Sequence, residues 1–386
     1  MSSKTNGIIS SNEITRRKFI KFGATGAATV SLIGMFGCSS TEEPAEPEAT
    51  EDASSETAEP TAEPEATTQV ITDLTGAEVE VPLEIEKIAD LWHAHNQIVI
   101  MLGAGDKLVG TTENFKNRAW ANVVYPRLAE VEALVVGSGA GEVNYEEALS
   151  LEPDVVFASD EEVTENARNQ GLTTVNVMFQ DYEGLRNNVT LTGQVLGAEA
   201  QAAADAWAAT LDENIDLVAS RTEGIADADK PRILHIVSPQ SYTMVDGTNT
   251  IVDEWIKLAG GVNAIETEGN RIELTLEEIL GSDPDIIIIG SAKPEDVDAF
   301  LADEQFSGLT AVQNGFVYAN PEGVFPWDRY SGEEALQILW AAKFFNPDLF
   351  EDVDMVQKTQ EFYSKFYGYD LTDDEATRIL EGELPE

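Results

Sequence analysis

The chain has 386 residues, enough to bury one large hydrophobic core or two medium ones. Its formal net charge is −48, and so acidic a surface repels nucleic acid and anionic lipid. A single cysteine, Cys38, excludes an internal disulfide and a zinc–thiolate site. We therefore expect no nucleic-acid partner, no redox thiol pair and no zinc–thiolate site.

Residues 1–38 have the basic, apolar and small-residue parts of a signal peptide. The basic part contains Arg16-Arg17 and resembles a twin-arginine export signal. The apolar part, residues 22–36, is shorter than the ~20 residues that a spanning helix needs. Met35-Phe-Gly-Cys38 resembles a lipobox, although Met and Phe depart from its usual pattern, and predicts lipidation of Cys38. The alternative is a plain signal that is cleaved elsewhere.

Residues 39–68 are rich in Glu, Pro, Ala, Thr and Ser and contain no basic residue. Such a segment cannot bury apolar surface, so it is predicted to be a disordered, self-repelling tether. The folded part is expected to begin near Gln69. Anchor, tether and folded part together predict an exported protein that a lipid holds at the cell membrane, facing the extracytoplasmic side.

The folded part alternates strand and helix patterns. Residues 70–82 predict a β-hairpin that turns at Thr75-Gly76. Residues 199–220 are rich in alanine without Gly or Pro, and predict one helix of ~30 Å at ~1.5 Å per residue. Further strands are predicted at 85–91, 108–110, 173–178, 232–237 and 315–318, and helices at 97–102, 250–258, 333–345, 353–366 and 373–380.

One pattern occurs twice, at 144–159 and 275–290, at a spacing of 131 residues without a gap. In each copy a glutamate pair opens a short helix, an acid-Pro-Asp turn ends it, and a buried strand follows. The repeat predicts an α/β fold with two similar lobes and a ligand cleft between them. The predicted parts are an N-terminal lobe at 69–198, a connecting helix at 199–224, and a C-terminal lobe with closing helices at 225–386.

Three features carry a resemblance to a known family: Asp73-Leu-Thr-Gly76, the segment from Leu102-Gly to Asp106-Lys-Leu-Val-Gly110, and the two Glu…Pro-Asp units. Together they resemble the iron-chelate/cobalamin substrate-binding proteins of ABC importers, over residues 69–370. The resemblance implies a rigid connecting helix, a ligand between the lobes, and an ABC permease dimer with its ATPase as the partner of a monomer. It also implies that Glu146 and Glu277 dock on permease arginines, with Glu147 and Glu278 as the nearest alternatives.

Polar and aromatic residues near predicted strand ends are the candidates for ligand binding. Arginine there suits a carboxylate, a catecholate or an oxyanion, because its planar fork binds bidentately and stays charged. A histidine could donate to an anion, and His93 and His95 could ligate a bare metal. His235 alternates within a strand and is expected in the core. The candidates are Trp92, His93, His95, Asn114, Arg118, Trp120, Ser159, Tyr242, Arg271, Trp327 and Arg329.

We therefore predict a receptor without a cofactor of its own that captures an iron complex, such as a siderophore-like metal chelate, and delivers it to an ABC importer. The alternatives on the same fold are molybdate or tungstate, haem, cobalamin, or a bare divalent metal such as nickel. A small oxyanion should not need Trp92, Trp120 and Trp327. An anchored metalloenzyme is disfavoured, because the sequence has no nucleophile motif and no dense His/Asp cluster.

Overall fold

The computed structural model describes residues 66–137 and 141–386. The predictions on the export signal, on Cys38 and on all but the end of the tether concern residues 1–65, which lie outside the described residues. The described residues belong to one compact unit. No helix in this part of the chain is both long enough and apolar enough to cross a membrane.

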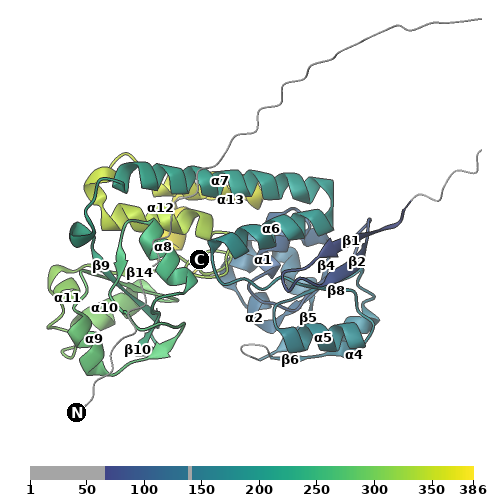
Figure 1. The fold of residues 1–386 in the computed structure, drawn as a ribbon, viewed down its shortest axis with the longest axis horizontal. Helices are drawn as coiled ribbons and strands as arrows, with labels where there is room; N and C mark the ends of the chain where they lie inside the picture. The colour runs from purple at the N-terminus through teal and green to yellow at the C-terminus, as the bar shows by residue number, and fades with distance from the viewer. Residues whose placement is uncertain (1–65, 138–140) are drawn as a thin grey trace, which may run out of the picture. The chain divides into compact units, whose positions relative to one another are not determined.

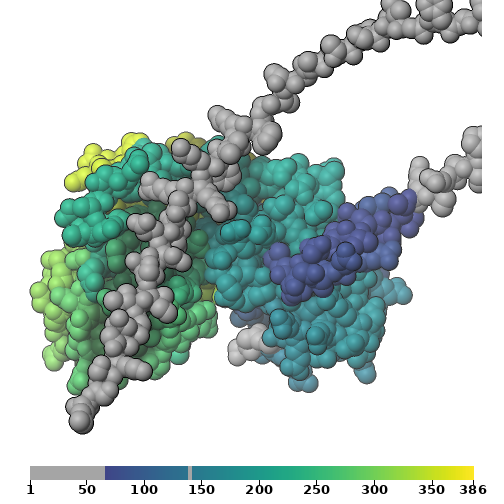
Figure 2. Space-filling view, in the orientation of Figure 1, coloured from purple at the N-terminus to yellow at the C-terminus, as the bar shows by residue number. Residues whose placement is uncertain are grey.

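The N-terminal lobe is built on a six-stranded sheet in the order β6-β5-β4-β3-β7-β8, parallel except for β6. The predicted hairpin is confirmed, with β1 (Thr68–Thr72) antiparallel to β2 (Glu78–Pro82), and lies at the surface of this lobe (purple in Figure 2). The sheet strands are β3 (Ile88–Asp90), β4 (Leu108–Thr112), β5 (Glu132–Val136), β6 (Glu142–Val143), β7 (Val155–Ala158) and β8 (Thr174–Asn176). The helices are α1 (Asn96–Met101), α2 (Glu113–Lys116), α3 (Ala119–Val124), α4 (Tyr145–Ser150), α5 (Glu161–Asn169) and α6 (Tyr182–Leu196).

The C-terminal lobe has a second six-stranded sheet in the order β12-β10-β9-β13-β14, with β11 also paired to β9. Its strands are β9 (Arg232–Ser238), β10 (Ser241–Val245), β11 (Val262–Asn263), β12 (Ile272–Glu273), β13 (Ile286–Ile289) and β14 (Val317–Ala319). Its helices are α8 (Ile251–Leu258), α9 (Leu276–Ser282), α10 (Pro294–Ala302) and α11 (Thr310–Asn314). The closing helices are α12 (Glu334–Phe345), α13 (Met355–Phe366) and α14 (Asp373–Leu380).

The sequence repeat has a physical basis in the sheets. Each Pro-Asp turn leads directly into a central strand, β7 in one lobe and β13 in the other. The carboxylate of Asp154 accepts a hydrogen bond from the backbone N–H of Lys87 at 2.8 Å, just before β3. Asp285 accepts from the N–H of Arg232, the first residue of β9, also at 2.8 Å. In each lobe the repeated aspartate thus aligns the start of its strand with the neighbouring strand.

Helix α7 (Ala198–Thr222) connects the two lobes (Figure 1). Its 25 residues give a length of ~37 Å, and it packs on α6 of one lobe and on α12 of the other. Trp207 donates to the carbonyl of Gly332 and Asn214 to that of Ala335, each at 2.7 Å. One hydrophobic core includes Trp207 together with apolar residues of both lobes, so this helical layer holds the lobes as a continuous packed unit.

Helix α6 is the longest element that the sequence did not predict. It contains two glycines and several Asn and Thr residues, which weaken a helical pattern. Tertiary contacts compensate: the buried Asn188 side chain donates to the carbonyl of Val177. A Cβ on Gly193 would lie 2.8 Å from the Cβ of Ala204, so glycine permits the close approach of α6 to α7.

Candidate functional site

A cavity of about 340 Å³ lies between the lobes, at the loops that follow the strands. A second cavity, of about 220 Å³, adjoins it through Trp92, His93 and Met178 and extends to Ser159 and Asp160. Both lobes contribute to the larger cavity, which therefore has the position expected for a ligand site. It is lined by Trp92, His93, Asn114, Arg118, Met178, Arg271, Ser291, Phe325, Pro326, Asp328, Arg329 and Tyr330.

His93 follows β3 and lines both cavities. No hydrogen bond of its ring to another described residue is found, and the ring lies 5.8 Å from that of Phe325. Burial lowers the pKa of His93 to about 4, and the positive charges of Arg118 and Arg271 act in the same direction. At neutral pH the imidazole is therefore uncharged and has one N–H to donate to a ligand.

Arg329 is held in a buried network of charges. Its guanidinium lies 2.6 Å from Asp246 and 3.3 Å from Asp328, and His235 lies 2.9 Å and 3.2 Å from the same two carboxylates. Burial alone raises the pKa of Asp246, but the hydrogen bond from His235 and the charge of Arg329 bring it well below its usual range. His235 is fully buried, as the sequence predicted. The charge of Arg329 is therefore balanced by Asp246 and Asp328, and Arg329 adds little net charge to the cleft.

The other two arginines differ in their pairing. Arg118 donates to the carboxylate of Glu322 at 2.7 Å and lies over the ring of Phe325 at 4.8 Å. Arg271 is exposed, and within residues 66–137 and 141–386 its guanidinium has no ion pair. Its backbone N–H donates to Asp246 at 3.0 Å, which fixes its position. Arg271 is thus the arginine of the cavity whose charge remains available to a ligand.

Aromatic side chains form one wall of the cleft. The rings of Trp92, Phe179 and Tyr330 lie 5.5–5.7 Å apart in tilted or edge-on contacts. The Tyr330 hydroxyl donates to the side chain of Gln180 at 3.3 Å, a contact that crosses from one lobe to the other. Trp92 and Tyr330 line the larger cavity, and Phe179 packs against both of them without lining it.

The backbone of the cavity is strained at three residues. Arg271, Ser291 and Tyr330 have φ values of 55°, 50° and 59°, in the left-handed region that non-glycine residues rarely adopt. Such conformations cost about 1–3 kcal/mol each and cluster at ligand sites. Their convergence on one cavity is independent support for a binding role.

The buried side chain of Glu333 holds the loop 321–330 in place by hydrogen bonds from inside the protein. Its carboxylate accepts from the backbone N–H of Phe325 at 2.9 Å, from the indole of Trp327 at 3.0 Å, and from the hydroxyl of Tyr363. Burial raises the pKa of Glu333 to about 7, although these hydrogen bonds favour the charged form. The position of Asp328, Arg329 and Tyr330 in the cleft thus depends on a carboxylate that sequence reasoning did not single out.

The family model described as "Periplasmic binding protein" matches residues 88–323, which include both central sheets and seven of the twelve residues that line the larger cavity. The chain belongs to the periplasmic binding protein family. The family expected from the sequence is thereby confirmed, as is the α/β fold of two similar lobes joined by one helix.

Several relatives of this periplasmic binding protein are ABC-transporter components. The molybdate-binding protein MolA of Haemophilus influenzae is 28% identical over 339 residues, covering 80% of this chain and 94% of MolA. The structure of MolA bound to molybdate superposes with a TM-score of 0.69 at 23% identity, over 79% of this chain and 99% of that one. YvrC of Bacillus subtilis, described as an ABC transporter substrate-binding lipoprotein, is 25% identical over 226 residues, 56% of this chain and 68% of YvrC.

A solved structure of a periplasmic solute binding protein from Veillonella parvula is also similar, with a TM-score of 0.71 and 28% identity. The match covers 81% of this chain and 97% of that one. These relatives are named as molybdate-binding, substrate-binding or solute-binding proteins. The same role, as the binding component of an ABC importer, follows for this periplasmic binding protein.

Of the eleven residues predicted to bind ligand, the structure brings seven to the two cavities. Six line the larger cavity, and one lines only the smaller cavity. They are Trp92, His93, Asn114, Arg118, Arg271 and Arg329, and then Ser159.

The other four predicted residues line neither cavity, and their placement is corrected. His95 is fully buried, with its ring nitrogens 2.6 Å from Asp90 and 2.9 Å from Thr192. Because His95 is enclosed in this way, it cannot join His93 at a bare metal. No group of three or more His, Cys, Asp or Glu side chains placed to hold a metal ion occurs in the described part of the chain.

The remaining corrections concern three aromatic residues. The indole of Trp120 donates to the carbonyl of Glu383 at 2.8 Å, and that of Trp327 donates to Glu333. Both tryptophans are buried. Tyr242 packs edge-on against Phe300 in the core of the C-terminal lobe, with ring centroids 4.8 Å apart. In each case a partner inside the protein takes the side chain away from the cleft.

Sequence reasoning missed six lining residues of the larger cavity: Met178, Ser291, Phe325, Pro326, Asp328 and Tyr330. Two signals could have found some of them. Ser291 corresponds through the 131-residue repeat to Asp160, which lines the smaller cavity. Asp328 and Tyr330 flank the predicted Arg329.

The two glutamates predicted to dock lie at equivalent places, Glu146 on α4 and Glu277 on α9. Both are exposed, and neither side chain has a hydrogen bond or ion pair to another described residue. The alternatives are engaged: Glu278 accepts at 2.8 Å from the N-cap residue of its own helix, and Glu147 accepts from Ser150 at 3.2 Å. The geometry therefore favours Glu146 and Glu277 as the pair available to a partner.

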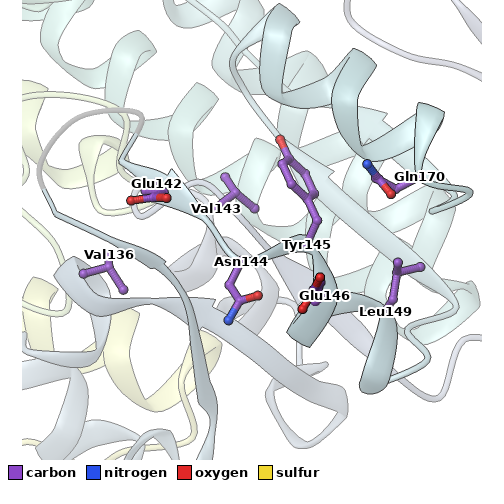
Figure 3. A pocket seen from close by; sticks show the side chains of 8 residues that line it. All are labelled: Val136, Glu142, Val143, Asn144, Tyr145, Glu146, Leu149 and Gln170. Carbon is purple, nitrogen blue, oxygen red and sulfur yellow. The ribbon is translucent and has the colours of Figure 1, made fainter.

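An open hollow of about 640 Å³ adjoins Glu146 on the N-terminal lobe (Figure 3). Val136 and Leu149 line it and are 55% and 39% exposed. Its lining among the described residues contains no Lys or Arg, in contrast to the cavity of about 340 Å³ between the lobes. An anionic ligand is therefore expected in the cleft and not in this hollow.

Proposed function

We propose that this protein captures a small tetrahedral oxyanion of the molybdate or tungstate class in its cleft and delivers it to an ABC importer. The observation that carries the proposal is the lining of the cavity of about 340 Å³, which contains Arg118, a neutral His93 and an Arg271 that has no ion pair within the described part of the chain. Arginine donates two parallel hydrogen bonds to an oxyanion, and a neutral imidazole adds one more. The sequence relation to MolA supports the same ligand class.

The iron-chelate hypothesis remains the second candidate. Trp92, Phe325 and Tyr330 offer apolar, planar surface to a catecholate or another aromatic chelate. The cavity lies at the lower end of the ~300–1,000 Å³ typical of ligand pockets, so haem or cobalamin would require wider separation of the lobes. A bare cation such as nickel is disfavoured, because the charges of Arg118 and Arg271 act directly on His93.

The deciding experiment is calorimetric titration of the purified protein, followed in parallel by tryptophan fluorescence because Trp92 lines the cavity. The ligands would be molybdate, tungstate, sulfate, ferric siderophores, haem, cobalamin and nickel. Saturable, submicromolar binding of molybdate or tungstate would support the proposal. Binding of a ferric chelate with no response to oxyanions would replace it by the second candidate.

Replacing Arg271 by glutamine is expected to weaken oxyanion binding at least tenfold. A hydrogen bond to a charged group contributes about 1.5–3 kcal/mol, and glutamine cannot supply the charge. The unfolding midpoint should not change, because the Arg271 side chain is exposed. Arg186→Gln, which removes a half-buried arginine that is paired with Asp212 and does not line the cavity, is the control. Equal affinities of Arg271→Gln and wild type would exclude Arg271 from the site.

We also propose that Glu146 and Glu277 dock on arginines of the permease. The double variant Glu146→Lys/Glu277→Lys is expected to lower transport at least tenfold while ligand affinity is unchanged, because two attractive pairs become repulsive. Uptake by the importer reconstituted in liposomes measures this. Glu147→Gln/Glu278→Gln is the control, and loss of transport in the control alone would assign docking to the alternative pair.

We also propose lipidation of Cys38, which the relation to a substrate-binding lipoprotein supports, and export by the twin-arginine route, which rests on Arg16-Arg17 in the sequence. The anchor would keep the receptor near its importer on the extracytoplasmic side. Fatty-acid labelling of cells that produce the protein tests this. Label retained in Cys38→Ser would refute the anchor site.

A further inference from the structure

One ion pair joins the two lobes at the edge of the cleft. Arg118, at the start of α3, belongs to the N-terminal lobe, and Glu322 follows β14 in the C-terminal lobe. Their side chains are 2.7 Å apart and only 23% and 22% exposed. A pair this enclosed is less screened by solvent than a surface ion pair.

This ion pair occupies an arginine that a ligand would use. One terminal nitrogen of Arg118 donates to Glu322, and the other lies 3.4 Å from the side-chain oxygen of Asn114. Arg118 itself lines the cavity, whereas Glu322 is not among the lining residues. An oxyanion that binds Arg118 therefore competes with the carboxylate of Glu322 for the guanidinium.

The backbone leaves the Glu322 side chain free to withdraw. The N–H of Glu322 donates to the carbonyl of Ile379 at 3.1 Å, which ties the main chain to the end of α14. The carboxylate has no other hydrogen bond among the described residues. The Glu322 side chain is 22% exposed, so part of it already contacts water.

We propose that Glu322 is a specificity-determining residue, whose carboxylate holds Arg118 in the empty cleft and admits only anions that displace it. This inference rests on the proposed oxyanion function. An incoming anion replaces the ion pair between Arg118 and Glu322 by its own ion pair with Arg118. A singly charged anion therefore gains little binding free energy. A doubly charged tetrahedral oxyanion gains more, because its attraction to Arg118 and Arg271 exceeds that of one carboxylate. Glu322 thereby excludes monoanions such as chloride and nitrate.

The test is titration of wild type and Glu322→Gln with molybdate, sulfate, nitrate and chloride. Glutamine keeps the shape of the side chain but removes the competing charge. We expect tighter binding of all four anions by the variant, and at least a tenfold smaller preference for dianions over monoanions. Glu383→Gln is the matched control, because its carboxylate lies in the neighbouring C-terminal segment but pairs with Arg378. An unchanged preference, or weaker binding of every anion, would overturn the proposal.

A second measurement needs no ligand. Phenylglyoxal modifies accessible arginines, and peptide mapping reports the rate at Arg118. We expect Arg118 to react several-fold faster in Glu322→Gln than in wild type, with Arg271 as the internal reference. Equal rates would overturn the role of Glu322 whatever the ligand is. Faster labelling together with no oxyanion binding by either protein would support control of Arg118 by Glu322 and would refute the oxyanion assignment.

Discussion

Replacing Arg329 by methionine is expected to lower the free energy of unfolding by about 3–5 kcal/mol, because it leaves buried carboxylates without their cation. Arg329 is 6% exposed and pairs with both Asp246 and Asp328. Methionine fills a similar volume, so the loss would report the charge network and not a cavity. Urea denaturation of wild type and variant measures the difference.

Two variants make the Arg329 prediction specific. Arg271→Gln removes an arginine from the same cavity, but an exposed one, and should leave stability within about 0.5 kcal/mol of wild type. Asp246→Asn added to the Arg329 variant should recover part of the loss, because one unpaired buried charge disappears. A loss below about 1 kcal/mol in Arg329→Met would mean that Arg329 is held mainly for ligand binding.

Replacing Glu333 by glutamine is expected to cost more stability at pH 5 than at pH 8. Burial raises the pKa of Glu333 to about 7 in the folded protein, above the ordinary value of 4.5. Its protonation therefore stabilises the fold fully below pH 4.5, and this contribution is lost as the pH rises through 7. Glutamine does not titrate, so the difference between wild type and variant should be about 2–3 kcal/mol larger at pH 5.

Urea denaturation at both pH values measures the Glu333 effect. Asp246 and Asp328 do not interfere, because their pKa values are lowered and their contribution is lost only as the pH falls below the ordinary value of 3.8. Glu277→Gln, at an exposed position, is the control and should differ from wild type equally at both pH values. The same equality in Glu333→Gln would show that Glu333 stays charged throughout.

The glutamate pair, the Pro-Asp turn and the apolar strand recur in the sequence because each lobe needs the same local unit. A proline ends the short helix, and the aspartate after it bonds to the start of the neighbouring strand at Lys87 or Arg232. These are effects of residues close in the chain or of simple periodicity, so two lobes and the connecting helix could be predicted. Helix α6 could not, because its Gly and polar residues are accommodated only by contacts with α7 and the sheet.

The residues of the site also divide into those that could be predicted from the sequence and those that could not. The carboxyl end of a strand in an α/β sheet faces the ligand crevice, so His93 and Ser159 could be selected from their positions in the chain. Whether a loop side chain turns to the cleft or to the core depends on partners that are distant in sequence. Trp120 turns inward because the carbonyl of Glu383, 263 residues away, accepts its indole hydrogen. Trp327 does so because a buried Glu333 lies beneath its loop.

The sequence by itself thus determined the family, the two-lobe architecture and the strand-end loops that carry the cleft. Only the tertiary structure decided the charge of that cleft. It pairs Arg329 with Asp246 and Asp328, pairs Arg118 with Glu322, and leaves Arg271 unpaired among the described residues. The physical reason is that the charge available to a ligand is a sum over ion pairs, and these pairs form between residues up to 204 positions apart.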